Sequence, residues 1–260
     1  MGRMLRRTWL IRAGLGLATL PVAAQKLPDL YHDEAYGDPP FLSEGGWRAL
    51  LNGKDLSGWH GLSGSPNEWF TTRAVHWKRV FNPTRLLGDR GPGDRIVNGP
   101  SNKTANLVTD EKFGSFELYL EFMTAKGSNS GVYLHGLYEV QIFDSYGFEG
   151  LLTVGDCGGI YEHADNTGGV PPVRNAVRAP GEWQSLHIWF AAPQFDAEGH
   201  KTKNARALRV LLNQLPVQEN VELTGPTRSS LEIPEAPRNP LMLQGDHSAI
   251  AYRNIYIKPL

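Results

Sequence analysis

Alternation of apolar and polar residues between Ser128 and Ser145 constrains the fold of this chain more than any other feature. It predicts two short strands that reverse direction near Gly136. Successive side chains of a strand point to opposite faces, so one face is expected to enter an apolar core. That core face would hold Val132, Leu134, Val140 and Ile142. The opposite face would bring together an imidazole, a carboxylate and an amide, a set more typical of a binding groove than of a solvated surface: His135, Glu139 and Gln141.

Short apolar runs separated by Gly, Pro, Asn and Asp continue along the rest of the chain. The clearest strand runs from Phe116 to Phe122, and a strand pair is expected between Glu68 and Val80. Further strands are predicted at residues 107–108, 183–191, 207–212, 217–221, 241–244 and 250–257. The segment from Tyr146 to Gly181 is rich in Gly and Pro and predicts a long loop. Because no helical period persists over three turns, the sequence predicts an all-β fold, an antiparallel β-sandwich or jelly roll.

The first 24 residues have the features of an export signal peptide. Three arginines precede an apolar run from Trp9 to Leu20, and Val22-Ala23-Ala24 supplies small residues for cleavage. The run is shorter than the ~20 residues that a membrane span needs. The adjacent Arg6 and Arg7 are compatible with the twin-arginine route. We therefore expect an exported protein, periplasmic or extracellular, with no transmembrane segment in its mature chain.

The charge balance and the cysteine count narrow the class of protein further. The chain has 26 basic and 27 acidic residues, and four of the arginines lie in residues 1–24, so the mature chain would carry a net charge of −5. No basic stripe is present, which argues against nucleic acid as a partner. Cys157 is the only cysteine, which excludes an internal disulfide, and we interpret it as a small buried side chain. A large core must then supply the stability, and we expect one domain over residues 47–260 after an irregular lead-in over 25–46.

Several familiar catalytic motifs are absent: there is no G-x-S-x-G, no H-E-x-x-H and no phosphate-binding glycine-rich loop. Carboxylates and histidines in the loops and along one sheet face remain as candidates for acid–base chemistry on a sugar. These are Glu139, Asp144, Glu162, His163, Asp246 and His247. The Asp246-His247 pair is the strongest, because it follows an expected core strand and would lie at its rim. Asp144 equally suits a turn cap, and Glu162-His163 equally suits a solvated loop.

Blocks of residues distributed along the chain resemble one known family. They read LLNGKDLSGW (50–59), NSGVY (129–133), YEVQI (138–142), GGIY (158–161), GEWQ (181–184), LQ (243–244) and YRNI (252–255). Together, and in this order, they are similar to the 3-keto-disaccharide (3-keto-glucoside) hydrolase family from about Trp47 to Leu260. The resemblance implies a concanavalin A-like jelly roll of two stacked sheets and action on 3-keto-glycosides. Two departures are present: His135 stands where many members carry arginine, and Gly245 looks like an insertion before Asp246.

In the reaction that this resemblance implies, a ketone at C3 acidifies the proton on C2. A base removes that proton, the aglycone leaves C1 by β-elimination, and water adds to the enone. We hypothesise that His247 acts as base or acid, oriented by Asp246, and that Glu139 is the complementary acid–base group. Residues expected to position the substrate are Asn129, Tyr133, His135, Gln141, Asp144, Tyr161, Asn175 and Gln244. A divalent metal ion that polarises O3 and O2 would serve the same purpose, with Glu139 and histidines as ligands, but no spacing requires one.

Two other functions fit the same groove. A non-catalytic carbohydrate-binding jelly roll would bind a glycan and release no product. A conventional retaining glycosidase would need two carboxylates about 5–5.5 Å apart. Such enzymes typically carry them on one strand as E-x-D-x-E, whereas this chain has Glu139-x-Gln141-x-Phe143. The absent second acid makes the retaining glycosidase the weakest of the three hypotheses.

Overall fold

The computed structural model describes residues 40–64 and 66–260. The predicted export signal, and the lead-in as far as residue 39, lie outside these residues. The described chain consists of short strands and loops, with one 3₁₀ helix at Pro40–Ser43. No helix in this described part has the length and apolar character that crossing a membrane requires.

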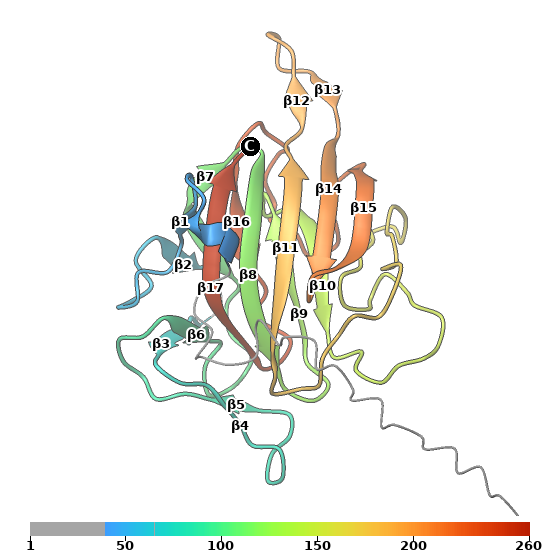
Figure 1. The fold of residues 1–260 in the computed structure, drawn as a ribbon. Coiled ribbons are helices and arrows are strands. Elements are labelled where there is room, and N and C mark those ends of the chain that lie inside the picture. Colours follow the sequence, from blue (N-terminus) through green and yellow to red (C-terminus); the bar gives the residue numbers. More distant parts are fainter. Residues whose placement is uncertain (1–39, 65) are drawn as a thin grey trace, which may run out of the picture.

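Two antiparallel sheets form the body of the molecule (Figure 1). The first, sheet A, has eight strands. In spatial order they are β15 (Leu215–Leu223), β14 (Ala205–Leu212), β11 (Trp183–Ala191), β8 (Phe116–Thr124), β17 (Ile250–Pro259), β6 (Arg95–Val97) and β3 (Phe70–Thr72), with β1 (Arg48–Ala49) also paired to β17. The second, sheet B, has five strands. They are β10 (Tyr138–Phe143), β9 (Asn129–Leu134), β16 (Asn239–Leu243), β7 (Leu107–Phe113) and β2 (Trp59–Gly61).

The main hydrophobic core lies between the two sheets. On β8 it takes the alternate residues Leu118, Leu120 and Phe122, and on the β9–β10 hairpin it takes the four residues predicted for the core face, Val132, Leu134, Val140 and Ile142. Figure 1 shows β17, β8, β11 and β14 in front of β9, β10 and β16, as expected for two stacked layers. The prediction of an all-β antiparallel sandwich of the jelly-roll type is confirmed.

The organising hairpin has its reversal where the sequence places it, but one predicted face residue is on the wrong side. His135 and Gly136 both adopt left-handed backbone angles, with φ of 55° and 67°. This turn redirects the His135 ring into the core, where it packs edge-on against Phe190 with ring centroids 4.7 Å apart. Its Nε2 lies 3.0 Å from the Gly114 carbonyl oxygen. The prediction that His135 shares a polar face with Glu139 and Gln141 is therefore wrong, because strand alternation ends at Leu134.

A β-bulge in β17 determines which face of the sheet Arg253 occupies. Uninterrupted alternation along this strand would place Arg253 in the core, on the same side as Ile255 and Ile257. The register of β17 against β8 shifts between Arg253 and Tyr256, and Asn254 has a φ of 49°. Both isoleucines remain in the core. Arg253 is buried on the opposite face of sheet A, where its Nε lies 2.6 Å from Glu121 Oε2.

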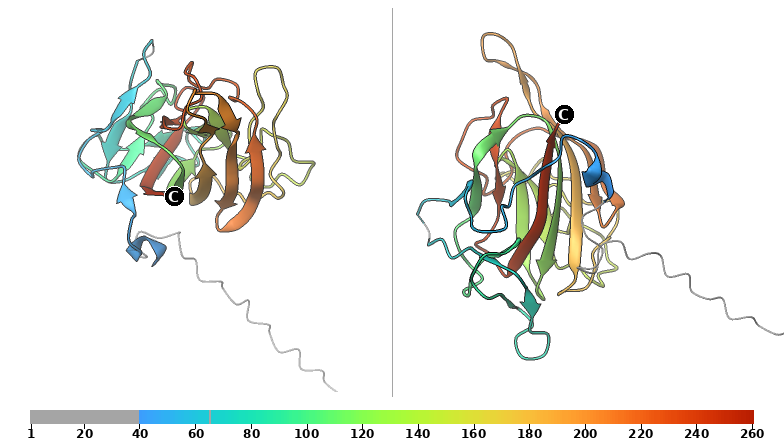
Figure 2. Two further views of the ribbon diagram at one scale, coloured as in Figure 1. Left: turned by 90° about the horizontal axis from the view of Figure 1, so that it is seen from above. Right: turned by 60° about the vertical axis from the view of Figure 1, so that its left-hand side comes forward.

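Two small hairpins extend from the sandwich. β12 (Gln194–Phe195) pairs with β13 (Lys201–Lys203), and the right-hand view of Figure 2 shows this hairpin projecting beyond the sheets. β4 (His76–Trp77) pairs with β5 (Leu86–Leu87) at the other end. The predicted strand pair between Glu68 and Val80 is wrong, because β3 joins β6 in sheet A while β4 pairs only with β5.

Cys157 is buried, as predicted, and burial raises the pKa of its thiol to about 12.

Candidate active site

Polar side chains gather on the face of sheet B that points away from the core. Strand register places Glu139 beside Tyr133, and Tyr133 beside Met242 on the next strand. One step along the strands, Gln141 lies beside Gly131. Gln244 follows β16, and its backbone N–H donates to the Gly131 carbonyl over 2.9 Å. This face therefore carries Glu139, Gln141, Tyr133 and Gln244 around a small apolar patch formed by Tyr133, Met242 and Val108.

The Glu139 side chain lies across the backbone of Gly131. A Cβ atom at Gly131 would be only 2.0 Å from Glu139 Oε1, so only glycine leaves space for the carboxylate there. The Glu139 backbone is fixed on both sides, because its N–H donates to Thr227 Oγ1 over 3.1 Å and its carbonyl accepts from the Tyr161 N–H over 3.1 Å. Two segments thus fix the Glu139 backbone, and a third, at Gly131, leaves space for its carboxylate.

Burial makes Glu139 a weak acid. The residue is 3% exposed, and desolvation raises the pKa of its carboxyl group to about 8. A hydrogen bond with the Tyr133 side chain and the charge of His247 act in the opposite direction, while Asp246 adds to the rise. Glu139 is consequently protonated at neutral pH and able to donate a proton.

Asp246 and His247 form a side-chain dyad at the rim of the same face. His247 Nδ1 lies 2.6 Å from Asp246 Oδ1, and both side chains are about half exposed. The hydrogen bond to Asp246 raises the pKa of His247, and it lowers the pKa of Asp246. With its Nδ1 bonded to the carboxylate, the imidazole is oriented so that Nε2 can exchange a proton with a substrate.

Two buried amides beside Glu139 have oxygen atoms without hydrogen-bond partners. Gln141 and Gln244 are each 4% exposed, and the Oε1 atom of each is unpaired. The Gln244 Nε2 group, by contrast, has a partner, because it donates to the Tyr133 hydroxyl over 3.4 Å. A buried acceptor without a partner costs free energy, which a donor such as a sugar hydroxyl would recover. These two oxygens are therefore unsatisfied acceptors beside the Glu139 carboxyl group.

Two loops from distant parts of the chain are joined beside this face by hydrogen bonds and an ion pair. Arg228, between β15 and β16, has a guanidinium nitrogen 3.3 Å from a carboxylate oxygen of Glu162. The Arg228 backbone N–H also donates to the Glu162 carbonyl over 2.8 Å, and its own carbonyl accepts from the Tyr133 hydroxyl over 3.3 Å. Glu162 thus has a structural partner. His163 turns to its own loop, with Nδ1 3.4 Å from Thr167 Oγ1.

The structure separates the remaining predicted site residues. Asn129 lies beside the dyad, since its carbonyl accepts from the hydroxyl of Ser248, the residue after His247. Tyr161 lies at the edge of the site, where its backbone N–H donates to the Glu139 carbonyl. Asn175 donates its amide to the Ser145 carbonyl over 2.7 Å and so holds a loop. Asp144 accepts from the Gly127 N–H over 2.8 Å and lines a different cavity at the end of the sandwich.

Sequence reasoning missed the residues that hold the site together. A glycine inside a predicted strand marks a place where another group approaches the backbone, so Gly131 had a detectable signal. Thr227 and Arg228 had none, because they are separated from β10 by about 90 residues and reach it only through the fold. Ser248 likewise contacts Asn129 across 119 positions of sequence.

Gly131→Ala should therefore disable the site while leaving the sandwich folded. The added methyl group would displace the Glu139 carboxylate, and a misplacement of about 1 Å is enough to lower kcat/KM about 100-fold. The measurement is kcat/KM on a 3-keto-glucoside, the substrate class that the sequence resemblance implies, together with a thermal melt. Gly155→Ala is the matched control, because a Cβ there would meet only Thr153 Oγ1 at 3.7 Å. Equal activity of Gly131→Ala and wild type would show that Glu139 need not lie where the structure places it.

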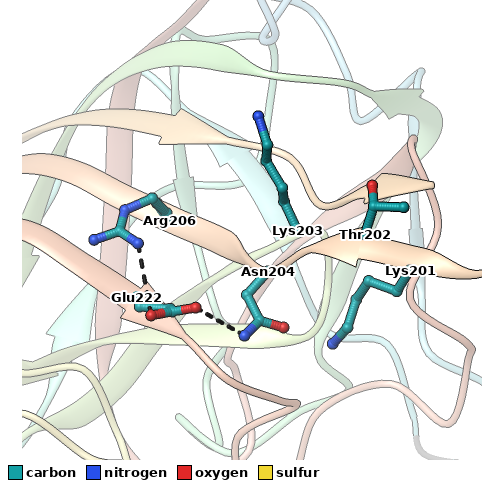
Figure 3. A pocket seen from close by; sticks show the side chains of 6 residues that line it. All are labelled: Lys201, Thr202, Lys203, Asn204, Arg206 and Glu222. Atoms are coloured by element: carbon teal, nitrogen blue, oxygen red, sulfur yellow. Dashed lines mark hydrogen bonds and ion pairs between the residues drawn. The ribbon is translucent and has the colours of Figure 1, made fainter. Parts of the chain in front are cut away.

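A cavity elsewhere on the surface does not have this chemistry. A cavity of about 410 Å³ beside the β12–β13 hairpin is lined by Lys201, Thr202, Lys203, Asn204, Arg206 and Glu222 (Figure 3). The figure shows Glu222 engaged by Arg206 and Asn204, and the Asn204 amide donates to it over 2.9 Å. Within residues 40–64 and 66–260, no cluster of three or more His, Cys, Asp or Glu side chains is arranged to hold a metal ion.

Comparison with known proteins agrees with this architecture. Residues 46–258 match the model of a family described as a 3-keto-alpha-glucoside-1,2-lyase-like domain. A crystal structure of "a putative glycosyl hydrolase" from Parabacteroides distasonis ATCC 8503 is 27% identical, with 83% of this chain and 84% of that chain covered and a TM-score of 0.59. A second structure with that description, from the same organism, is 24% identical with a TM-score of 0.53 over 82% of this chain and 99% of its own, and shows the fold. A search of curated proteins finds no match.

Proposed function

Because the chain belongs to the 3-keto-alpha-glucoside-1,2-lyase-like family of glycoside-active enzymes, we propose that it cleaves 3-keto-glycosides by β-elimination followed by hydration. The observation that supports this best is the burial of the Glu139 carboxyl group on the face of sheet B that has the Asp246-His247 dyad at its rim. One group is ready to donate a proton and the other to accept one. Elimination from a 3-keto-glycoside requires both.

The reaction divides between these two groups. His247 removes the proton from C2, which the neighbouring C3 ketone has acidified, and the electron pair forms the C1–C2 double bond as the C1–O bond breaks. Glu139 protonates the departing oxygen, so the aglycone leaves as an alcohol. Water then adds its oxygen to C1 and a proton to C2 of the enone, which gives the free 3-keto sugar. The net change is hydrolysis, with no oxidant or reductant consumed.

Substrate binding uses the acceptors beside Glu139. The side-chain amides of Gln141 and Gln244, whose Oε1 atoms have no partner within the protein, would rotate to accept hydroxyl protons of the sugar ring. The Tyr133 hydroxyl, which bonds to the Glu139 side chain and to the Arg228 carbonyl, would orient the Glu139 carboxyl group for proton transfer. The buried apolar surface of Tyr133 and Met242 excludes water and strengthens each of these interactions.

The pH dependence of kcat/KM should be bell-shaped and narrow. Glu139 must be protonated, so activity falls as the pH rises through about 8, the raised pKa of that group. His247 must be neutral, so activity falls as the pH drops through its pKa, which Asp246 holds above the ordinary value. Asp246→Asn should move the acid limb to lower pH. An acid limb that stays in place in this variant would exclude His247 as the base.

A paired assay tests the proposed reaction. The mature protein is incubated with an aryl 3-keto-glucoside and with its unoxidised parent, each with and without a chelator, and aglycone release is followed. Release from the keto form alone is the expected result, and a chelator that stops it would show that a divalent metal takes part. Release from the parent at a similar rate would instead indicate an ordinary glycosidase. Binding of both compounds without release would indicate a lectin-like protein.

We also propose that the protein acts outside the cytoplasm. The support is the arginine-rich, apolar and small-residue pattern of residues 1–24. Expression of the full chain followed by fractionation and N-terminal sequencing should give a periplasmic or secreted protein that begins near Gln25. A cytoplasmic protein with an intact N-terminus would contradict this.

A further inference from the structure

A cavity of about 780 Å³ lies at the end of the sandwich, apart from the candidate active site. It is built from the β4–β5 hairpin, the turn after β8, the loop after β10 and the residues before β11. Its lining is Trp77, Arg79, Pro83, Lys126, Asp144, Tyr146, Ala179, Pro180, Gly181 and Glu182. The volume is within the range of about 300–1,000 Å³ typical of small-molecule sites.

Two aromatic rings contribute apolar surface to this cavity. Trp77 is fixed, because its Nε1–H donates to the Pro83 carbonyl over 2.7 Å and its ring packs against Gly181. A Cβ atom at Gly181 would lie 2.4 Å from that ring, and the residue has a φ of 82°, so glycine is needed there on both counts. Tyr146 is different, since 60% of its surface is exposed. One wall is thus rigid and the other is free to adapt to a ligand.

The polar part of the lining has both signs of charge. Arg79 and Lys126 are cationic, and Asp144 and Glu182 are anionic. Asp144 uses Oδ2 to accept from the Gly127 N–H, while its Oδ1 has no hydrogen-bond partner. A ligand with strong negative charge would meet two carboxylates, and a purely apolar ligand would have to desolvate four charged groups. A neutral ligand whose hydroxyls both donate and accept suits both signs of charge.

We propose that this cavity is a second saccharide-binding site that takes a neutral glycosyl unit. The apolar C–H face of a sugar ring matches the faces of Trp77 and Tyr146, which combine broad apolar surface with a polar tip. Its hydroxyls match the mixed charges of Lys126 and Asp144. The site binds and has no catalytic role.

The position of the cavity makes it independent of the proposed reaction. Asp144 follows Glu139 by five positions, which places it about 16 Å further along β10 at roughly 3.3 Å per residue. Trp77 packs against the apolar cluster of Met123, Trp183 and Ala251, which is separate from the core cluster between the sheets. A sugar in the cavity therefore does not need the residues around Glu139, whatever those residues do.

Calorimetric titration with maltose, cellobiose and sucrose tests the proposal on the mature protein. At least one of these unoxidised disaccharides should bind to wild type and to Glu139→Gln equally. Tyr146→Ala should weaken that binding about tenfold, as the loss of an aromatic anchor does, while Tyr146→Phe should keep it. Phe148→Ala is the matched control, since Phe148 is 47% exposed in the same loop but does not line the cavity.

The outcomes separate this site from the proposed activity. Tyr146→Ala should retain kcat/KM on an aryl 3-keto-glucoside, because such a substrate has no second sugar. Failure of all three disaccharides to bind, or equal affinity of Tyr146→Ala and wild type, would overturn the second site and leave the proposed reaction untouched. Disaccharide binding that is lost in Gln141→Ala but kept in Tyr146→Ala would assign it to sheet B alone and would also overturn the proposal.

Discussion

Glu139→Gln is expected to lower kcat/KM on a 3-keto-glucoside by about 10²- to 10⁴-fold, the usual contribution of a general acid. Glutamine fills the same space above Gly131 and still accepts from Tyr133, but it has no proton of suitable acidity for the leaving oxygen. The residual activity of the variant should no longer fall at alkaline pH, because glutamine does not titrate. Unchanged turnover in a folded variant would remove Glu139 from the mechanism.

The same substitution should make the protein more stable at alkaline pH. Burial raises the pKa of Glu139 from 4.5 to about 8, so between these values the unfolded chain has released a proton that the folded chain retains. Stability therefore falls as the pH rises through this window, by about 1.4 kcal/mol for each pH unit at most. Glutamine is neutral throughout and avoids this loss. The free energy of unfolding in urea at pH 6 and pH 9 measures the difference.

Glu149→Gln serves as the control for both effects. Glu149 is exposed in the loop after β10, so its replacement should change neither kcat/KM nor the slope of stability with pH. A Glu139→Gln variant whose stability falls with pH as steeply as wild type would show that Glu139 is ionised in the folded protein.

Arg253→Met should cost about 3–5 kcal/mol of unfolding free energy, the usual penalty when one partner of a buried ion pair is removed. The Arg253 and Glu121 side chains are 7% and 3% exposed, and their charged groups approach to 2.6 Å. The guanidinium also lies 4.4 Å from the centre of the Trp183 ring. Methionine fills much of the volume but leaves the Glu121 carboxylate buried without its counter-charge, although the Tyr119 hydroxyl, 2.9 Å away, still donates to it.

A double variant and an exposed control complete this prediction. Glu121→Leu combined with Arg253→Met should recover most of the lost stability, because no charge is then left buried. Arg209→Met removes an exposed pair, with 3.6 Å between Arg209 and Glu219, and should change stability by less than about 0.5 kcal/mol. A single variant at Arg253 that is no worse than Arg209→Met would contradict the structural role of the buried pair. Urea unfolding of wild type, the two single variants and the double variant measures these differences in unfolding free energy.

Most of the fold could be predicted because period-two alternation is a local property of the sequence. Phe116 to Phe122 and the two strands of the hairpin, 129–134 and 138–143, show it without interruption, and the structure has strands there. Alternation fails where one residue leaves the regular backbone angles. His135 in the turn and Asn254 in the bulge each do so. The first places its own imidazole ring in the core, and the second places its neighbour Arg253 on the face opposite Ile255 and Ile257.

Less of the candidate site could be predicted, since it depends on contacts between distant segments. Glu139, Gln141, Tyr133 and Gln244 follow from strand parity and share one face. The support of Glu139 by Thr227 and the pairing of Arg228 with Glu162 depend on how two long loops cross the sheet, which no local pattern encodes. The position of Asp144 at the end of its strand could also be predicted. The chain turns there, however, so Asp144 lines a different cavity.

Cleavage of a 3-keto-glucoside in D₂O tests the central claim most directly, because elimination and direct hydrolysis leave different marks on C2. The product sugar is isolated early in the reaction and its deuterium content at C2 is measured by mass spectrometry and NMR. Free 3-keto sugar kept in D₂O for the same time corrects for uncatalysed exchange. If His247 removes the C2 proton and water later adds to the enone, the product carries deuterium at C2 well above that background. A product that retains its original proton at C2 would mean that the C1–O bond breaks without elimination, and it would contradict the proposed reaction.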